Sequence, residues 1–239
     1  MAAQLKACVI VPTYNERENV EAVALAVAAV DPSLQVVFVD DSSPDGTADE
    51  VRRVAAANSN VHLLLRKGKM GLGSAHIDGF GYAMKELGAQ AVVEMDSDLQ
   101  HPPEKIPELV GALGGGCEVV VASRKVSGGG TTNWSLWRRT LSRGANLIAR
   151  SVLGLGVKDS TSGFRALSRK AAEALVEAKL PTSSYSFQVA SLFYLKKKGM
   201  GMKEIPFVFR ARNAGKSKMG AGEIARFFWS ILKIRILGF

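Results

Sequence analysis

Runs of branched apolar residues alternate with longer amphipathic segments through the first half of the chain. Short apolar runs predict buried strands, and segments of roughly 10–15 residues with helical apolar spacing predict helices. Strands joined by single helices form a parallel sheet, and right-handed crossovers place helices on both of its faces. We expect strands at 6–11, 34–40, 61–65, 91–95 and 118–122, with helices at 17–30, 46–57, 72–87 and 103–113 between them.

The pattern changes after residue 124, where a glycine-rich loop covers 125–132. A helix is expected from about 134 to 153, and Arg138, Ser142 and Asn146 then share one face at intervals of four residues. We expect Arg139 and Arg143 of the same helix to be ordinary solvated side chains. The remaining elements are a strand at 163–167, helices at 168–177 and 185–195, and a strand at 202–209.

The length and composition fit one α/β domain with a Rossmann-like, nucleotide-binding layout. The chain has 239 residues, 47% of them hydrophobic, which suffices for a full core. It has neither G-x-G-x-x-G after the first strand nor G-x-x-x-x-G-K-[ST] anywhere, which argues against a nicotinamide-dependent dehydrogenase and a P-loop ATPase. Cys8 and Cys117 lie in separate apolar runs and predict no disulfide framework, and we expect no signal peptide.

Positive charge is concentrated at the C-terminal end. Residues 196–239 carry 11 of the 31 basic side chains but only two of the 22 acidic ones. No uncharged stretch in 221–239 exceeds six residues, so this segment is too polar to span a membrane. Ile224, Phe227 and Ile231 follow helical one-face spacing, as does Phe228, with basic residues between them. We therefore expect a catalytic domain at 1–220 and an amphipathic helix at 221–239 on a membrane surface; the alternative is a terminal helix docked on the domain's own core.

Two carboxylates one residue apart, Asp96 and Asp98, follow the apolar run 91–93. Prolines at 102 and 103 cannot continue a strand, so the carboxylates lie at its C-terminal end, where ligands bind in open α/β sheets. Close carboxylates repel each other unless a cation lies between them, and hard cations such as Mg²⁺ or Mn²⁺ prefer oxygen ligands. Gln100 offers a further oxygen. For an isolated pair of this kind, a solvated acidic turn is the alternative.

Seven motifs occur in order between residues 6 and 220: VPTYNEREN (11–19), VDDSSPDGT (39–47), GLG (71–73), DSDLQHPPE (96–104), SRGAN (142–146), GFR (163–165) and GKSK (215–218). Together they resemble the dolichol-phosphate mannose synthases, which are inverting glycosyltransferases of the GT-A, family 2 type. The resemblance implies GDP-mannose as the donor, dolichyl or another polyprenyl phosphate as the acceptor, and Mg²⁺ or Mn²⁺ as the metal. The implied product is dolichyl β-D-mannosyl phosphate, with GDP released.

The resemblance also assigns residues. It implies that GDP-mannose is bound by two groups of residues, one at the ends of the first two strands and one further along the chain. These are Pro12, Tyr14, Glu16, Val39 and Asp41, and then Asp96, Ser97, Asp98, Gln100, Arg124, Gln188, Arg212 and Lys218. The implied metal ligands are Asp96, Asp98 and Gln100, and the implied catalytic residues are Asp98, Arg124, Arg138 and Ser142.

The residue chemistry agrees with these implications. The leaving group is GDP and the nucleophile is a phosphate oxygen, so two anions must come together, which a metal and arginine guanidinium groups favour. An ionised phosphate needs no general base, so we assign none and expect in-line displacement with inversion. Two departures from the family pattern concern Ser97, where alanine is frequent, and Ala190, where an acid is frequent.

The expected location is the cytoplasmic face of a membrane, with peripheral attachment and no transmembrane span. A separate small membrane subunit is a further partner that this interpretation allows. Two alternatives stay open. In the first, the chain is a related transferase that uses UDP-glucose or another sugar nucleotide with the same lipid phosphate. In the second, it is a basic nucleic-acid-binding protein. The second alternative requires aromatic side chains interleaved with the basic ones, and the basic residues here lie mainly in a phosphate-type loop or beside lipid-type side chains, so we expect no nucleic acid.

Overall fold

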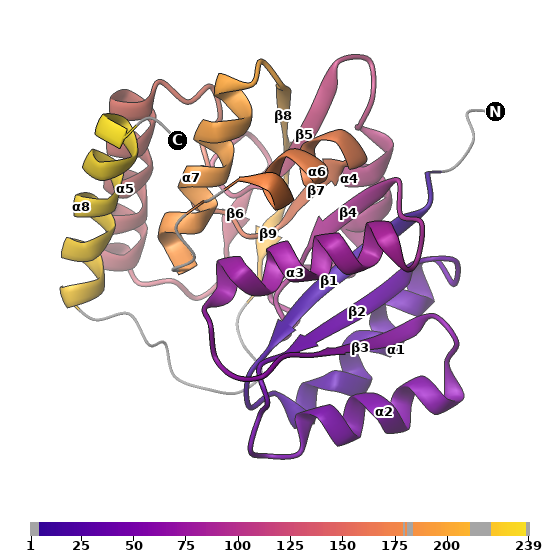
Figure 1. Ribbon diagram of the computed structural model, residues 1–239. Helices are drawn as coiled ribbons and strands as arrows, with labels where there is room; N and C mark the ends of the chain where they lie inside the picture. Colours follow the sequence, from indigo (N-terminus) through magenta and orange to yellow (C-terminus); the bar gives the residue numbers. More distant parts are fainter. Residues whose placement is uncertain (1–4, 179, 181–183, 211–220, 238–239) are drawn as a thin grey trace.

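A seven-stranded sheet forms the centre of the protein in the computed structural model (Figure 1), which describes all residues except 1–4, 179, 181–183, 211–220 and 238–239. The strand order is β3-β2-β1-β4-β7-β5-β8, and every pairing is parallel except those of β7, which runs antiparallel to both neighbours. The prediction of an α/β fold with a mostly parallel sheet is therefore confirmed. The strands are β1 Ala7–Thr13, β2 Gln35–Asp40, β3 Val61–Leu65, β4 Ala91–Glu94, β5 Cys117–Ser123, β7 Arg165–Ser168 and β8 Gly201–Pro206.

Helices cover both faces of this sheet, and each face has its own hydrophobic core. Alternate residues of β1 point to opposite sides, so Val9 and Val11 join one core and Cys8 and Ile10 join the other. The first core is closed by α1 Val20–Val30, α2 Thr47–Ala57 and α4 Ile106–Gly111, with 3₁₀ turns Arg17–Asn19 and Pro103–Lys105 before α1 and α4. The second core is closed by α3 Leu72–Lys85, α6 Arg169–Glu177 and α7 Ser184–Lys197.

Two long helices, α5 Leu136–Leu153 and α8 Ala221–Leu237, lie side by side next to α7, at the left of Figure 1. The side chain of Ser135 caps α5 by accepting a hydrogen bond from the Arg138 backbone N–H, and Gly154 ends the helix in a left-handed conformation. A short ribbon, β6 Gly130–Thr131 with β9 Val208–Phe209, ties the glycine-rich loop to the chain after β8. The strand predicted at 202–209 is thus divided between two sheets.

The apolar side chains predicted on α8, as far as the structure describes them, face the protein and not a membrane. Phe227 and Ile231 are buried in the second core together with Ile234, so the described part of the stripe expected to face a membrane packs on the protein, as the alternative interpretation proposed. The large apolar side chains exposed on the described part of α8 are Trp229, Leu232 and Ile236. Among the residues that the structure describes, no helix combines the length and apolar character that a membrane crossing requires.

Candidate active site

The predicted nucleotide residues on the first two strands and the carboxylate pair meet at the carboxyl edge of the sheet. β1 lies between β2 and β4, so the segments that follow these three strands are neighbours. This is the point where the strand order reverses, which is where ligands bind in open α/β sheets. The turn after β2 is held by Asp40, whose Oδ1 accepts hydrogen bonds from the hydroxyls of Thr13, at 3.1 Å, and Ser43, at 2.6 Å.

The residues after β1 have well-defined partners. Pro12 is half-buried near the end of the strand, and the Lys69 ammonium lies 4.1 Å from the centre of the Tyr14 ring. Glu16 accepts a hydrogen bond of 2.7 Å from the Asn19 side chain, and its own backbone N–H donates to the Thr47 hydroxyl. Tyr14 and Glu16 therefore stay half-buried at the sheet edge, with an aromatic surface and a carboxylate available to a nucleoside.

The residues after β2 are more deeply buried. The Val39 side chain belongs to the core, so only its backbone can meet a ligand. Asp41 is buried beside Arg66, whose Nε lies 3.2 Å from Asp41 Oδ1. Burial raises the pKa of Asp41, and the Arg66 guanidinium opposes that rise. Arg66 also lies near Asp78 and donates to Ser74, so it links the β2 turn to α3, a role that the sequence did not reveal.

The first carboxylate of the pair, Asp96, is oriented by a buried histidine. His101 Nδ1 accepts the Asp96 backbone N–H at 3.1 Å, and its Nε2 lies 3.6 Å from Asp96 Oδ2. Burial lowers the pKa of His101 to about 3, so the ring is neutral and, with Nδ1 accepting, carries its proton on Nε2. The imidazole stacks on Phe164, with ring centres 5.0 Å apart. No role was predicted for His101 from the sequence.

The second carboxylate lies on a tight turn. Asp98 Oδ1 accepts the Gln100 backbone N–H at 3.1 Å, and Leu99 between them has a positive φ of 55°. The Gln100 side chain donates through Nε2 to the Arg210 carbonyl at 2.8 Å, which fixes the amide. Ser97 is buried, so only its backbone can meet a ligand.

These groups fit a hard divalent cation. Asp96 and Asp98 provide carboxylate oxygens, Gln100 is an amide with its nitrogen turned to the protein, and Mg²⁺ and Mn²⁺ complete their coordination with water and substrate phosphates. Among the described residues, no cluster of three His, Cys, Asp or Glu side chains has metal-binding geometry. A cation at this site therefore depends on two carboxylates and on the ligand itself, which is typical of nucleotide-dependent metal binding.

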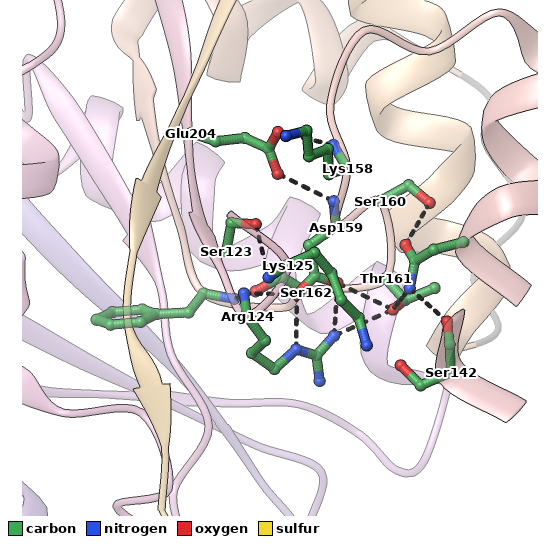
Figure 2. A network of polar contacts seen from close by, with 12 residues as sticks. Ser123, Arg124, Lys125, Ser142, Lys158, Asp159, Ser160, Thr161, Ser162 and Glu204 are labelled. Carbon is green, nitrogen blue, oxygen red and sulfur yellow. Dashed lines mark hydrogen bonds and ion pairs between the residues drawn. The ribbon is translucent and has the colours of Figure 1, made fainter. Parts of the chain in front are cut away.

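Arg124 is held by a network that the sequence did not predict (Figure 2). Its Nε and Nη2 form 2.7 Å hydrogen bonds to the two carboxylate oxygens of Asp159, and its backbone N–H donates to the same carboxylate at 2.9 Å. The Arg124 side chain is 8% exposed and that of Asp159 is fully buried. Arg124 lowers the pKa of Asp159 against the opposing effect of burial. Glu204 on β8 accepts the backbone N–H groups of Lys158 and Asp159, at 2.7 and 3.0 Å, and so holds this turn.

The same turn also positions α5. Asn146 is buried, and its side chain accepts a hydrogen bond from Ser160 and donates to Thr161 at 3.1 Å and to the Ser142 carbonyl at 2.9 Å. Thr161 accepts a further hydrogen bond from Arg124. The signal in the sequence was the polar run 158–162 just before a strand, which is buried here at Asp159, Ser160 and Ser162.

Four of the predicted site residues line one hollow of about 150 Å³. They are Asp96, which follows β4, Arg124, which follows β5, and Arg138 and Ser142 of α5. Arg138 stacks on Trp134, with the guanidinium carbon 4.0 Å from the ring centre. The remaining surface is largely apolar, and it includes Leu141 and Ala145 of α5, Phe209 of β9, and Phe227 and Phe228 of α8.

The other predicted residues lie elsewhere. Pro12, Tyr14, Glu16, Val39, Asp41, Ser97, Asp98 and Gln100 surround the carboxyl edge of the sheet and do not line this hollow. Gln188 is buried behind Gly163, and its backbone carbonyl accepts a hydrogen bond from the buried Arg165. Arg212 and Lys218 lie outside the described residues.

Comparison with known proteins places the chain in a family. The family model described as "Glycosyl transferase family 2" matches residues 8–176. The chain belongs to glycosyl transferase family 2. Polyprenol monophosphomannose synthase of Mycolicibacterium smegmatis is 36% identical to this glycosyltransferase, over 96% of the chain and 87% of that protein. Undecaprenyl-phosphate mannosyltransferase of Micrococcus luteus is 37% identical, over 91% of the chain and 89% of that protein.

Dolichol-phosphate mannosyltransferase of Pyrococcus furiosus is 35% identical over 96% of the chain, which spans 64% of that longer protein. These relatives confirm both the predicted resemblance and the prediction of an enzyme. Among solved structures, glucosyl-3-phosphoglycerate synthase of Mycobacterium tuberculosis with phosphoglyceric acid has a TM-score of 0.69, at 18% identity, over 98% of this chain and 80% of its own. The same enzyme with Mn²⁺ and UDP-glucose has a TM-score of 0.68, at 19% identity, over 98% and 80%. This likeness confirms the GT-A fold of the glycosyltransferase.

Proposed function

We propose that the protein transfers mannose from GDP-mannose to a polyprenyl phosphate, with inversion at the anomeric carbon. The observation that carries the proposal is the hollow between β4, α5 and α8, which has a charged part and an apolar part. Asp96, Arg124 and Arg138 line the charged part, and Phe227 and Phe228 line the apolar part. An acceptor with a phosphate joined to an isoprenoid chain matches both.

The names of the relatives support the acceptor class. They specify polyprenol, undecaprenyl and dolichol lipids, which share a phosphate head and differ in the isoprenoid. The motifs after β1 and β2 are those by which the chain resembles enzymes that use GDP-mannose. The donor then occupies the carboxyl edge of the sheet beside Tyr14, and its diphosphate reaches Asp96 and Asp98.

The residues of the hollow account for the chemistry. A divalent cation bound by Asp96 and Asp98 would neutralise charge on the departing diphosphate. Ser142 donates a hydrogen bond to the acceptor phosphate, and Arg138 neutralises it. The acceptor oxygen is already ionised near neutral pH and needs no base, so positioning and charge neutralisation provide the catalysis. Attack from the face opposite the leaving group inverts the configuration at the anomeric carbon.

We further propose that α5 and α8 lie on the surface of the membrane that holds the acceptor. These two neighbouring helices carry many of the exposed large apolar side chains that the structure describes. Trp137 is 72% exposed and Ile236 is 81% exposed, and Lys233 and Arg235 stand near the latter. Aromatic, apolar and basic residues together are typical of helices at a membrane interface. We propose attachment to the cytoplasmic face, with or without a separate small membrane subunit.

The experiment that tests the activity is transfer of labelled mannose from GDP-mannose to dolichyl or undecaprenyl phosphate, with Mg²⁺ or Mn²⁺ present. We expect labelled lipid with the β-configuration at the phosphate linkage, and none after chelation of the metal. The absence of labelled lipid with both acceptors would overturn the proposal. Lipid of the α-configuration would overturn the inverting mechanism alone.

The donor has its own test, because a second sugar nucleotide remains the alternative. The solved structure with Mn²⁺ and UDP-glucose shows that a GT-A fold accommodates a uridine nucleotide as well. Calorimetric titration with GDP and with UDP, each in Mg²⁺, compares the two bases directly. Tighter binding of UDP than of GDP would mean that the donor is a uridine nucleotide sugar and not GDP-mannose. The proposal for the lipid acceptor would stand.

A further inference from the structure

A second hollow, of about 360 Å³, lies beside the first and shares Arg124 and Trp134 with it. Its walls are the glycine-rich loop between β5 and α5 and one side of α5. Four basic side chains line it, and its lining contains no carboxylate. They are Arg124, Lys125, Arg139 and Arg143. A concave surface of this kind concentrates positive potential.

The charges around this hollow are not balanced within the described part of the chain. Lys125 is half-buried, and burial together with Arg124 and Arg143 lowers its pKa, against the opposing effect of Asp159. Asp159 lies next to Lys125 (Figure 2), but its carboxylate already accepts three hydrogen bonds from Arg124. No acid within the described residues forms an ion pair with Lys125 or Arg143. A half-buried cation without a counter-ion is costly, which favours an anionic ligand.

The wall opposite α5 has a fixed shape. Gly129 donates its backbone N–H to the Val126 carbonyl at 2.9 Å, and Gly130 donates to the Phe207 carbonyl at 3.0 Å. A Cβ atom at Gly129 would clash with the carbonyl oxygen of Ser123, so the loop passes that strand in close contact. On the α5 side, Arg139 donates to the Thr131 carbonyl at 3.3 Å, which holds its guanidinium at the rim. The hollow is therefore formed before a ligand arrives.

We propose that this second hollow binds a phosphate group, separate from the phosphates of the donor and the acceptor in the first. The occupant is either the headgroup phosphate of an anionic phospholipid or a free phosphate, because both present the same oxygens to Lys125 and Arg143. The exposed side chains of Leu136 and Trp137 stand at the start of the same helix, so a lipid surface that meets α5 brings headgroups to the hollow. The site goes beyond the proposed transfer reaction and does not depend on it.

Fluorescence of Trp134 tests the proposal, since this side chain lines the hollow and the chain has three tryptophans in all. In a Trp137→Phe, Trp229→Phe background, inorganic phosphate is titrated without any sugar nucleotide. Lys125→Ala with Arg143→Ala should weaken phosphate binding at least about tenfold, because each removes a charge-assisted contact. Lys125→Arg with Arg143→Lys should restore it.

Two further pairs of substitutions separate the site from its surroundings. Arg138→Ala with Ser142→Ala removes two side chains that line the first hollow and not the second, and Arg52→Ala with Lys85→Ala removes two positive charges from exposed positions on α2 and α3. Both pairs should leave phosphate affinity nearly unchanged. The proposal is overturned if Lys125→Ala with Arg143→Ala leaves phosphate affinity unchanged. It is also overturned if the Arg138 pair causes a larger loss of affinity than the Lys125 pair, or if the exposed pair causes an equal loss.

Vesicles identify the source of the phosphate. Flotation with phosphatidylcholine vesicles, with and without phosphatidylglycerol, is compared for the same three pairs of substitutions. If the Lys125 and Arg143 pair loses binding to the anionic vesicles beyond the loss of the exposed pair, the occupant is a lipid headgroup. If that pair weakens the binding of inorganic phosphate but not of anionic vesicles, the occupant is a free phosphate. Both results support the site.

Discussion

The most direct prediction concerns the buried pair of Arg124 and Asp159, and the perturbation is Asp159→Asn. The substitution keeps the shape of the side chain and one carbonyl acceptor, but it removes the charge that faces the Arg124 guanidinium across two 2.7 Å hydrogen bonds. Breaking a buried ion pair on one side costs about 3–5 kcal/mol. Because Arg124 lines both hollows and can gain some hydration there, we expect about 3 kcal/mol, at the lower end of that range.

Urea unfolding followed by circular dichroism measures this loss. For a chain of this length, about 3 kcal/mol corresponds to a fall of roughly 6–12 °C in melting temperature. The matched control is Asp49→Asn, which breaks the exposed pair of Asp49 and Arg52 and should leave the unfolding free energy nearly unchanged. A loss at Asp159 below about 1 kcal/mol, the range of surface pairs, would refute the argument that Arg124 is held by a desolvated partner.

The pH dependence provides a second measurement of the same pair. Arg124 holds the pKa of Asp159 below its ordinary value in the folded state. The stability that Asp159 contributes is therefore fully present above the ordinary pKa of an aspartate, about 3.9, and is lost as the pH falls through the folded-state pKa. The difference in unfolding free energy between the native chain and Asp159→Asn should have its full value at pH 7 and should shrink in acid. A difference that stays constant down to strong acid would contradict the assigned pairing.

Three further predictions concern the metal, the glycine loop and the membrane. Asp98→Ala should reduce metal-dependent transfer by about 10²–10³, the effect of losing an electrostatic stabiliser, without shifting the urea midpoint, since the half-buried Asp98 lies on a turn and belongs to neither hydrophobic core. Gly129→Ala should destabilise the fold by about 1–3 kcal/mol through its clash with the Ser123 carbonyl, whereas Gly130→Ala, with open space around it, should not; equal urea midpoints would exclude the close approach. Trp229→Asp with Leu232→Asp should abolish flotation with vesicles, while Leu25→Asp on the exposed side of α1 should not, and a loss caused equally by Leu25→Asp would reflect general destabilisation.

The sequence predicted the sheet well because its strands are short, buried apolar runs. The expected ends of β2 and β3 agree with the structure to within one residue, and the ends of β1 agree to within two. The antiparallel direction of β7 was not predictable from its residues, since it depends on how the chain between β5 and β7 returns. The ribbon of β6 and β9 pairs residues 78 positions apart, and neither two-residue strand has a periodicity of its own.

The candidate site was predicted where its chemistry is local and missed where it is not. The spacing of Asp96 and Asp98 and the i, i+4 placement of Arg138 and Ser142 are visible in the sequence. Asp159 lies 35 residues from Arg124, so their pairing follows only from the fold. His101 has polar and proline neighbours in the chain, and its burial comes from Phe164, Phe207 and Phe209, which belong to distant segments.

The pairing of Arg124 also changes how the charges near the site act together. Because Asp159 balances its charge, Arg124 supplies fixed hydrogen-bond geometry more than net attraction for an anion. Further positive charge lies on α5, where Arg138 lines the first hollow and Arg143 lines the second. A transferase that joins two anions needs both a rigid donor at the reacting phosphate and a field that draws the substrates in. In the proposed reaction the end of β5 would supply the former through Arg124 and α5 would supply the latter through Arg138, so we expect substitutions at Arg124 and at Arg138 to affect different steps.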